Sequence, residues 1–234
     1  MDFPERGGEQ KTVHDMEDRM QSTDSKQWAS HVQAIRQTLA ARQQGLLGYT
    51  DARKTAVLVT LQPNAQDELE VLFEHRAKTL RRQPGEISFP GGHIEPSDNS
   101  EADAAIREAS EELGVSVSDI ELVGALDVLP AGSSLLVYPF VGLIRQGVRL
   151  NPNPDEVAEV FSLSCNRLLT FEPDVYDIPL KPEFPEDFPY HLIPNGRNYK
   201  WRTSVQRQYF FQTDSWVIWG LTARILKHFL DLQR

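Results

Sequence analysis

Cysteine is almost absent from this sequence of 234 residues, which contains only Cys165. A single cysteine excludes an intramolecular disulfide and is typical of proteins from a reducing compartment. Neither a second cysteine nor a histidine is patterned around it. We therefore expect Cys165 to be a small, buried, apolar side chain.

Long apolar runs are also missing, and none approaches the roughly 20 residues that a membrane-spanning helix needs. The first residues do not combine a basic segment with an apolar one, as a secretory signal does. The last three residues, Leu232 to Arg234, match neither the endoplasmic-reticulum nor the peroxisomal address. The sequence therefore predicts a cytoplasmic protein without a membrane partner.

The sequence has few basic residues. It contains 24 lysines and arginines against 34 aspartates and glutamates, and its net charge is −10. Binding to nucleic acid through phosphate contacts depends on a basic field that this chain lacks. We therefore expect no nucleic-acid partner. An anionic small molecule would have to be bound through local cations or a metal ion. A homodimer is compatible with the composition, which does not decide the oligomeric state.

A regular alternation of strands and helices is absent, and no glycine-rich dinucleotide motif follows the first apolar run. Apolar, β-prone segments nevertheless recur along the chain. The continuous run from Lys54 to Leu61 predicts a strand that is buried on both faces. The pattern favours an α/β sandwich with a mixed β-sheet. Further strands are expected at residues 69–73, 87–89, 120–129, 136–144, 157–163 and 199–211.

Two segments, one before and one after these expected strands, have apolar residues at helical spacing. From Trp28 to Leu39 it predicts a helix within residues 28–47, either packing on the domain or binding a partner. Residues 216–232 carry an apolar stripe that predicts a terminal helix with one buried face.

Composition divides the rest of the chain. Residues 1–25 are polar and charged, which predicts a flexible N-terminal tail. Residues 171–198 contain six prolines and are expected to form an irregular excursion. We assign residues 26–234 to a single domain.

A cluster of three carboxylates stands out in the middle of the chain. Ser100 and Gly114 are the N-cap and C′ residues expected for a helix between them. At about 100° per residue, Glu108, Glu111 and Glu112 fall on one side of that helix. Like charges at these spacings repel one another. The cluster therefore indicates either a solvated acidic face or a site for a hard divalent cation, which prefers oxygen ligands.

The pattern around this helix resembles the Nudix box, the signature of hydrolases that cut nucleoside diphosphates linked to another moiety. The segment just upstream resembles the motif of the coenzyme A pyrophosphatase branch of that family. The box here comprises Gly91, Gly92, Arg107, Glu108, Glu111, Glu112 and Gly114, and the upstream motif comprises Arg76, Ala77, Arg81, Gly85, Phe89, Pro90, Gly91 and Gly92.

One position departs from the box. The glutamate that usually precedes the arginine by eight residues is replaced by Asn99, and the segment from Gly92 to Arg107 is one residue longer than standard. Asp98 is the candidate to take over the role of that glutamate.

The resemblance implies a Nudix-type α/β/α sandwich and a metal-dependent pyrophosphatase. Glu108, Glu111 and Glu112, with the carbonyl oxygen of Gly92, would hold Mg²⁺ or Mn²⁺. Arg107 would orient the glutamates. The general base would be Glu111 or a residue on a loop that could fold back over the site, Glu156.

The resemblance also implies a substrate, coenzyme A or its thioesters, with adenosine 3′,5′-bisphosphate and 4′-phosphopantetheine as products. Arg76 and Arg81, with Lys78 or Arg82, would meet the 3′-phosphate or the pyrophosphate. Phe89 is either a core residue or a ring that stacks on the substrate. The alternatives are a Nudix pyrophosphatase of ADP-ribose, NADH or an oxidised nucleotide, and a non-catalytic nucleotide sensor. A sensor would be expected to have lost a glutamate of the box, and all three are present.

Overall fold

The computed structural model describes residues 28–234, which fall into two units, 28–47 and 48–234. The tail expected at residues 1–25 lies outside this range, and the assignment of residues 26–234 to one domain stays a prediction. In the first unit the helix spans residues 28–40 and is shorter than expected. Of its apolar stripe, the side chains of Trp28, Ile35 and Leu39 are exposed.

The second unit is built on an eight-stranded mixed sheet with the central order β3-β2-β1-β7-β5. β1 and β7 run parallel, whereas the other neighbouring pairs are antiparallel. β4, β6 and β8 pair with β1, β7 and β2 respectively. The strands are β1 (Arg53–Pro63), β2 (Leu69–Arg76), β3 (Ile87–Ser88), β4 (Gly91–His93), β5 (Ile120–Ala125), β6 (Leu129–Pro130), β7 (Leu135–Ile144) and β8 (Val157–Ser164).

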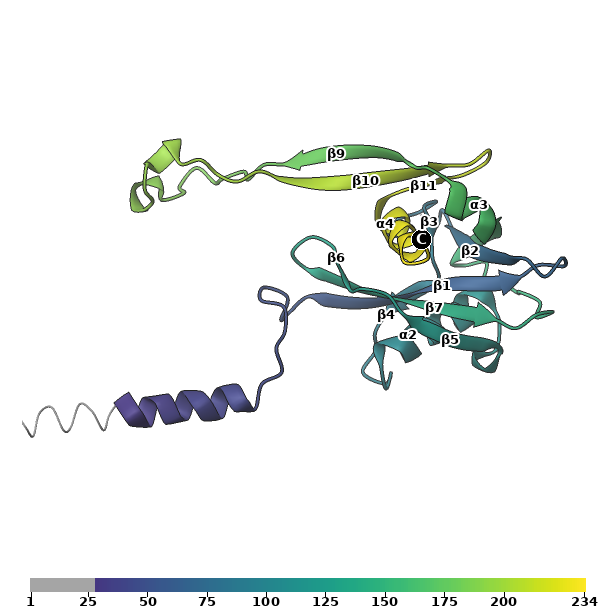
Figure 1. The fold of residues 1–234 in the computed structure, drawn as a ribbon, viewed down its shortest axis with the longest axis horizontal. Coiled ribbons are helices and arrows are strands. Elements are labelled where there is room, and N and C mark those ends of the chain that lie inside the picture. The colour runs from purple at the N-terminus through teal and green to yellow at the C-terminus, as the bar shows by residue number, and fades with distance from the viewer. Residues whose placement is uncertain (1–27) are drawn as a thin grey trace, which may run out of the picture. The chain divides into compact units, whose positions relative to one another are not determined.

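The sheet is covered on both faces, as the apolar run of β1 predicts (Figure 1). Ala56 and Leu58 pack with α2 (Glu101–Leu113), while Val59 and Leu61 pack with α4 (Gly220–Asp231). Successive side chains of a strand point to opposite faces, so one strand contributes to two separate cores. Strand β1 and the two helices therefore form the centre of an α/β/α arrangement.

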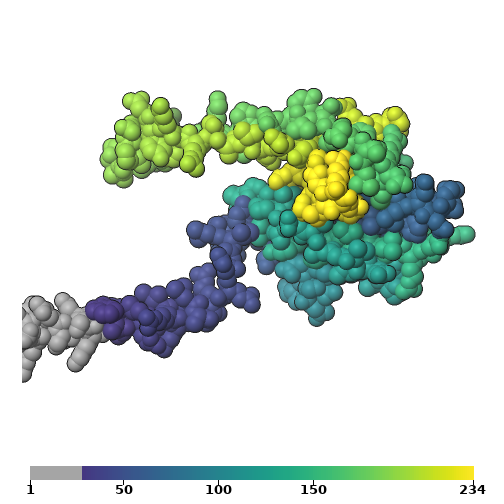
Figure 2. Space-filling view, in the orientation of Figure 1, coloured from purple at the N-terminus to yellow at the C-terminus, as the bar shows by residue number. Residues whose placement is uncertain are grey.

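The proline-rich segment differs from its expected irregular form. Strand β9 (Asp174–Leu180) lies within it and pairs with β10 (Ser204–Gln212), which also pairs with β11 (Val217–Ile218). Pro179 is tolerated because β9 is an edge strand, where a missing N–H need not break a ladder. Strands β9 and β10, with residues 181–203 at their far end, form an arm beside α4 (Figure 2).

Three further boundaries also differ. The strand expected at 120–129 is interrupted between β5 and β6, the one expected at 199–211 begins at Ser204, and the helix expected from residue 216 begins at Gly220 after β11. A short helix, α3 (Cys165–Thr170), was not predicted. Cys165 is buried as expected, and burial raises its thiol pKa to about 11. No helix within residues 28–234 is long and apolar enough to cross a membrane.

Candidate active site

Helix α2 has both of the predicted caps. The Oγ atom of Ser100 accepts a hydrogen bond of 3.1 Å from the backbone N–H of Asp103. Gly114 adopts the left-handed conformation at φ 64°. These caps satisfy backbone groups at the helix ends and bring three glutamates to one edge of the helix.

Glu112 is the innermost of the three glutamates, with a relative exposure of 4%. Its Oε2 atom accepts a 2.7 Å hydrogen bond from the backbone N–H of Gly91, and its Oε1 atom lies 3.8 Å from Nη1 of Arg76. Burial raises the pKa of Glu112 to about 7, although the Gly91 hydrogen bond and Arg76 lower it. The carboxyl group of Glu112 is therefore hard to ionise, because its two polar neighbours only partly offset the effect of burial.

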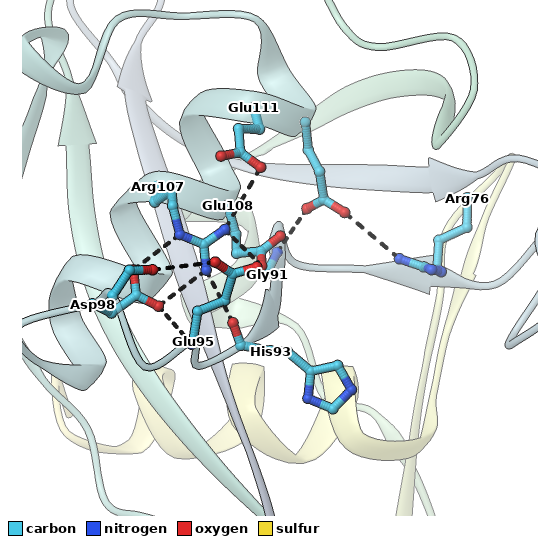
Figure 3. A network of polar contacts seen from close by, with 10 residues as sticks. Arg76, Gly91, His93, Glu95, Asp98, Arg107, Glu108 and Glu111 are labelled. Atoms are coloured by element: carbon cyan, nitrogen blue, oxygen red, sulfur yellow. Dashed lines mark hydrogen bonds and ion pairs between the residues drawn. The ribbon is translucent and has the colours of Figure 1, made fainter.

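Arg107 binds the other two glutamates to the loop in front of the helix (Figure 3). Its Nε and Nη2 atoms donate to the two oxygens of Asp98 at 2.9 and 3.1 Å. Its Nη1 atom donates to Glu108 at 3.0 Å and lies 3.6 Å from Glu111, while Nη2 also reaches the carbonyl oxygen of His93 at 3.0 Å. These contacts raise the pKa of Arg107, most strongly through Asp98.

The glycine pair allows the sheet to approach this helix. A Cβ atom on Gly92 would lie 2.4 Å from the carboxyl carbon of Glu108, and one on Gly91 would lie 2.4 Å from the carbonyl oxygen of Ala56. Such distances are far inside van der Waals contact. Position 91 therefore requires glycine, because the obstacle there is backbone, whereas a side chain at position 92 would displace the Glu108 carboxylate, which rests directly against the backbone of β4.

The loop before β8 brings Glu156 to the site. The backbone N–H groups of Asn151 and Asn153 donate to the last carbonyls of α2, at Leu113 and Glu112. The charge of Glu156 raises the pKa of Glu108 and of Glu112, although burial is the larger cause for both. Glu156 therefore lies close enough to these two glutamates for its charge to act on them.

A cavity of about 580 Å³ opens beside the glycine pair. Arg76 and Phe89 line it, and Phe89 also packs in the core, stacked on Phe73 with ring centroids 5.1 Å apart. Arg81 and Lys78 are exposed and are not among the cavity residues. The remaining polar and charged residues of the wall are Arg53, Thr55, Arg82, Gln83, Glu86, Ser88, His93 and Thr222.

Comparison with known proteins identifies this arrangement. A family model described as the NUDIX domain matches residues 52–182, more than half of the chain. The chain belongs to the Nudix family. It is therefore a Nudix hydrolase, an enzyme that acts on pyrophosphate-containing substrates, and the predicted α/β sandwich with a mixed sheet is confirmed.

Two relatives of this Nudix chain carry the name uncharacterized Nudix hydrolase NudL. The protein from Photorhabdus laumondii is 33% identical over 67% of this chain and 73% of its own length. The protein from Pectobacterium atrosepticum is 33% identical over 77% of this chain and 82% of its own length.

Solved Nudix structures resemble parts of the chain. RenU, a Nudix hydrolase from M. smegmatis, is 21% identical, with a TM-score of 0.42 over 49% of this chain and 72% of that one. A C. elegans Ap4A hydrolase is 18% identical, with a TM-score of 0.41 over 48% of this chain and 80% of that one. Both likenesses are partial, and the family assignment rests on the sequence match.

Nudix hydrolases generally use divalent metal ions such as Mg²⁺ or Mn²⁺. Within residues 28–234 no three acidic, histidine or cysteine side chains converge closely enough to form a ready-made metal site. Glu108 and Glu111 are instead turned toward Arg107, and Glu112 toward Gly91. The donor set still suits a hard cation, since it offers carboxylate oxygens whose negative charge is only partly balanced.

Glu74 on β2 also indicates that the site suits a cation. This residue was not predicted from the sequence as part of the site. It is fully buried, and neither carboxylate oxygen has a hydrogen-bond partner among the described residues. Burial raises its pKa well above the usual range, and the neighbouring charge of Glu112 adds to this effect. The only signal in the sequence is that this glutamate directly follows the apolar run of Val71 to Phe73. A cation bound nearby would offset the cost of ionising such a buried carboxyl.

Proposed function

We propose that this Nudix hydrolase cleaves the pyrophosphate bond of coenzyme A or of its thioesters, giving adenosine 3′,5′-bisphosphate and 4′-phosphopantetheine. The proposal is supported by the position of the segment from Arg76 to Gly92, whose sequence resembles the coenzyme A pyrophosphatase motif. Nine residues of that segment line the cavity. A substrate held by this segment would have its pyrophosphate next to the glutamates of α2.

A divalent cation, Mg²⁺ or Mn²⁺, belongs to this proposal. Glu108, Glu111 and Glu112 would hold it, together with the carbonyl oxygen of Gly92. Such a cation supplies charge neutralisation at the pyrophosphate and lowers the pKa of the attacking water.

The chain's own residues would then orient the substrate and move the proton. Arg76, which is ion-paired with Glu112, would bind a pyrophosphate oxygen. Arg107 would keep Glu108 and Glu111 in place. As the oxygen of water bonds to phosphorus, the bridging phosphorus–oxygen bond breaks, and a carboxylate takes the proton of the water. That carboxylate is Glu111, which is largely exposed, or Glu156, whose charge acts on the buried Glu112.

Glu156→Gln distinguishes the two bases, because Glu111 is also a proposed metal ligand. If Glu156 is the base, Glu156→Gln should lower kcat while metal affinity, measured by titration calorimetry, changes little. If Glu111 is the base, Glu156→Gln should leave kcat near that of the wild type, and Glu111→Gln should weaken metal binding as well as turnover.

The substrate is tested directly by incubating the protein with coenzyme A and Mg²⁺ or Mn²⁺ and identifying the products by mass spectrometry. Adenosine 3′,5′-bisphosphate and 4′-phosphopantetheine are expected in equal amounts. No cleavage with either metal would exclude coenzyme A. ADP-ribose, NADH and oxidised nucleotides belong in the same panel, and the highest kcat/KM among them would then identify the substrate class.

A further inference from the structure

Two arginines of the cavity wall take no part in the bond cleavage described above, although the family resemblance already offers Arg82 as a phosphate contact. Arg53 is the first residue of β1, and Arg82 lies in the segment between β2 and β3. Neither forms an ion pair or hydrogen bond through its side chain with any residue of 28–234. Other exposed arginines, such as Arg81 and Arg149, also lack such a partner. The only described arginines that line this cavity, however, are Arg53, Arg76 and Arg82.

The strand geometry separates Arg53 from the pyrophosphate end of the cavity. Arg53, Thr55 and Val57 alternate along β1, and all three line the cavity. Val57 lies opposite Gly91, which donates to the buried Glu112. At about 3.3 Å per residue, the Cα atom of Arg53 is roughly 13 Å further along the strand. The cavity thus has one basic residue beside the glutamates and another well away from them.

Arg76 is poorly placed to serve that second end. Its guanidinium lies 3.8 Å from Glu112, and its side chain is only 20% exposed. Moving it to a remote group would leave the buried carboxylate of Glu112 without its nearest cation, at a cost in free energy. Arg53, by contrast, can bind a ligand without breaking an ion pair with any described residue.

We propose that Arg53, assisted by Arg82, binds a phosphate monoester on the ribose of the substrate, at a distance from the bond that is cleaved. An arginine fork matches the geometry of a phosphate and binds it through two parallel hydrogen bonds. A local cation is needed because the net charge of −10 repels such a group. The proposal rests on the proposed function, since coenzyme A carries this group as its 3′-phosphate. NADPH carries the same chemical group at its 2′ position.

The test compares substrates that differ only in this phosphate: coenzyme A with dephospho-coenzyme A, and NADPH with NADH. For each pair the ratio of kcat/KM values measures recognition of the monoester. We expect Arg53→Ala to lower the ratio for the preferred pair at least tenfold. Arg53→Lys should retain part of it, because lysine keeps the charge but loses the fork.

Lys54→Ala is the matched control. Lys54 is the next residue of β1, forms an ion pair with Glu101 at 3.9 Å and does not line the cavity. For the Lys54→Ala variant, the ratio of kcat/KM values for the two substrates should equal that of the wild type. Unchanged melting temperatures would show that both variants are folded. An Arg53→Ala ratio equal to the wild-type ratio would overturn the proposal.

A binding measurement keeps the two proposals separable. If the wild type cleaves neither coenzyme A nor dephospho-coenzyme A, the proposed function fails, and titration with adenosine 3′,5′-bisphosphate and with AMP still tests the subsite. We expect the wild type to bind the bisphosphate at least tenfold more tightly and Arg53→Ala to lose most of that preference. Equal affinity of the wild type for both nucleotides would contradict the subsite.

Discussion

Asp98 shows how one residue can compensate for a departure from a family pattern. Asn99 stands where the Nudix box has a glutamate, yet Asp98 provides a carboxylate that binds both Nε and Nη2 of Arg107. The backbone N–H of Glu95 donates to the same carboxylate. The hydrogen bond from Arg107 is the main reason that the pKa of Asp98 is lowered. Asp98 is therefore ionised and able to hold Arg107 in position.

We predict that Asp98→Asn lowers kcat about tenfold or more with a smaller change in KM, because Arg107 loses the charge that orients it toward Glu108. Steady-state kinetics on the best substrate of the panel would measure this. Glu95→Gln is the control, since its backbone N–H to Asp98 is retained. Similar kinetics for the two variants would mean that Asp98 does not position Arg107.

The buried carboxyl of Glu112 has a consequence for stability in the absence of metal. Its pKa is raised to about 7 from an ordinary value of 4.5, mainly by burial. The folded state therefore binds a proton more tightly than the unfolded state. The resulting stabilisation is fully present below about pH 4.5 and is lost as pH rises through 7.

We predict that the metal-free protein loses free energy of unfolding between pH 5 and pH 8, on the order of a few kcal/mol, as the Glu112 carboxyl next to the buried Glu74 loses its proton. Glu112→Gln resembles the protonated side chain and should show a flatter dependence. Urea unfolding in EDTA at both pH values measures the difference. The exposed Glu121→Gln serves as control and should follow the wild type. Parallel curves for Glu112→Gln and the wild type would contradict the prediction.

Helix α2 and the loop from Asn151 to Glu156 depend on each other. The loop donates two hydrogen bonds to the last carbonyls of the helix. A Cβ atom on Gly114 would lie only 1.8 Å from the carbonyl oxygen of Asn151. The glycine that ends the helix thus also makes room for the loop that carries Glu156.

We predict that Gly114→Ala costs about 3 kcal/mol or more of unfolding free energy and also lowers kcat, because the loop must move. Gly147→Ala is the control, since Gly147 has a φ of +82° but no atom within 4 Å of the added Cβ. It should cost only about 1–2 kcal/mol, the penalty of the left-handed conformation, without an effect on kcat. Equal losses in the two variants would show that the contact with Asn151 is unimportant.

The two units of the chain differ in how much core they contain. Every buried apolar residue of the two core clusters lies between Ala56 and Leu230. The side chains of Trp28, Ile35 and Leu39 in the first unit are exposed. The stability of the fold should therefore come from the second unit.

We predict that a chain starting at Gly48 melts within about 4 °C of the full-length protein, which corresponds to roughly 1–2 kcal/mol for a domain of this size. Its kcat/KM should be unchanged, since every residue of the site follows Gly48. Thermal unfolding and kinetics of both chains test this. A fall of more than about 10 °C would mean that the first 47 residues contribute to the fold.

Local patterns were sufficient for most elements and for part of the site. The caps of α2 follow from Ser100 and Gly114, and the burial of β1 on both faces follows from its unbroken apolar run. Strand β9 was missed because its proline, Pro179, argues against a strand unless the strand lies at an edge. Whether a strand lies at an edge depends on which segments pair, and the local sequence does not contain that information.

By itself, the sequence determined the helix that carries Glu108, Glu111 and Glu112 and the glycines that face it, because capping and periodicity act over a few residues. Tertiary structure decided what surrounds this helix. It buries Glu74 beside Glu112, brings Glu156 across from a distant loop and leaves Arg53 at the far end of the cavity. These residues come from separate strands and loops, and only the long-range pairing of the sheet brings them together.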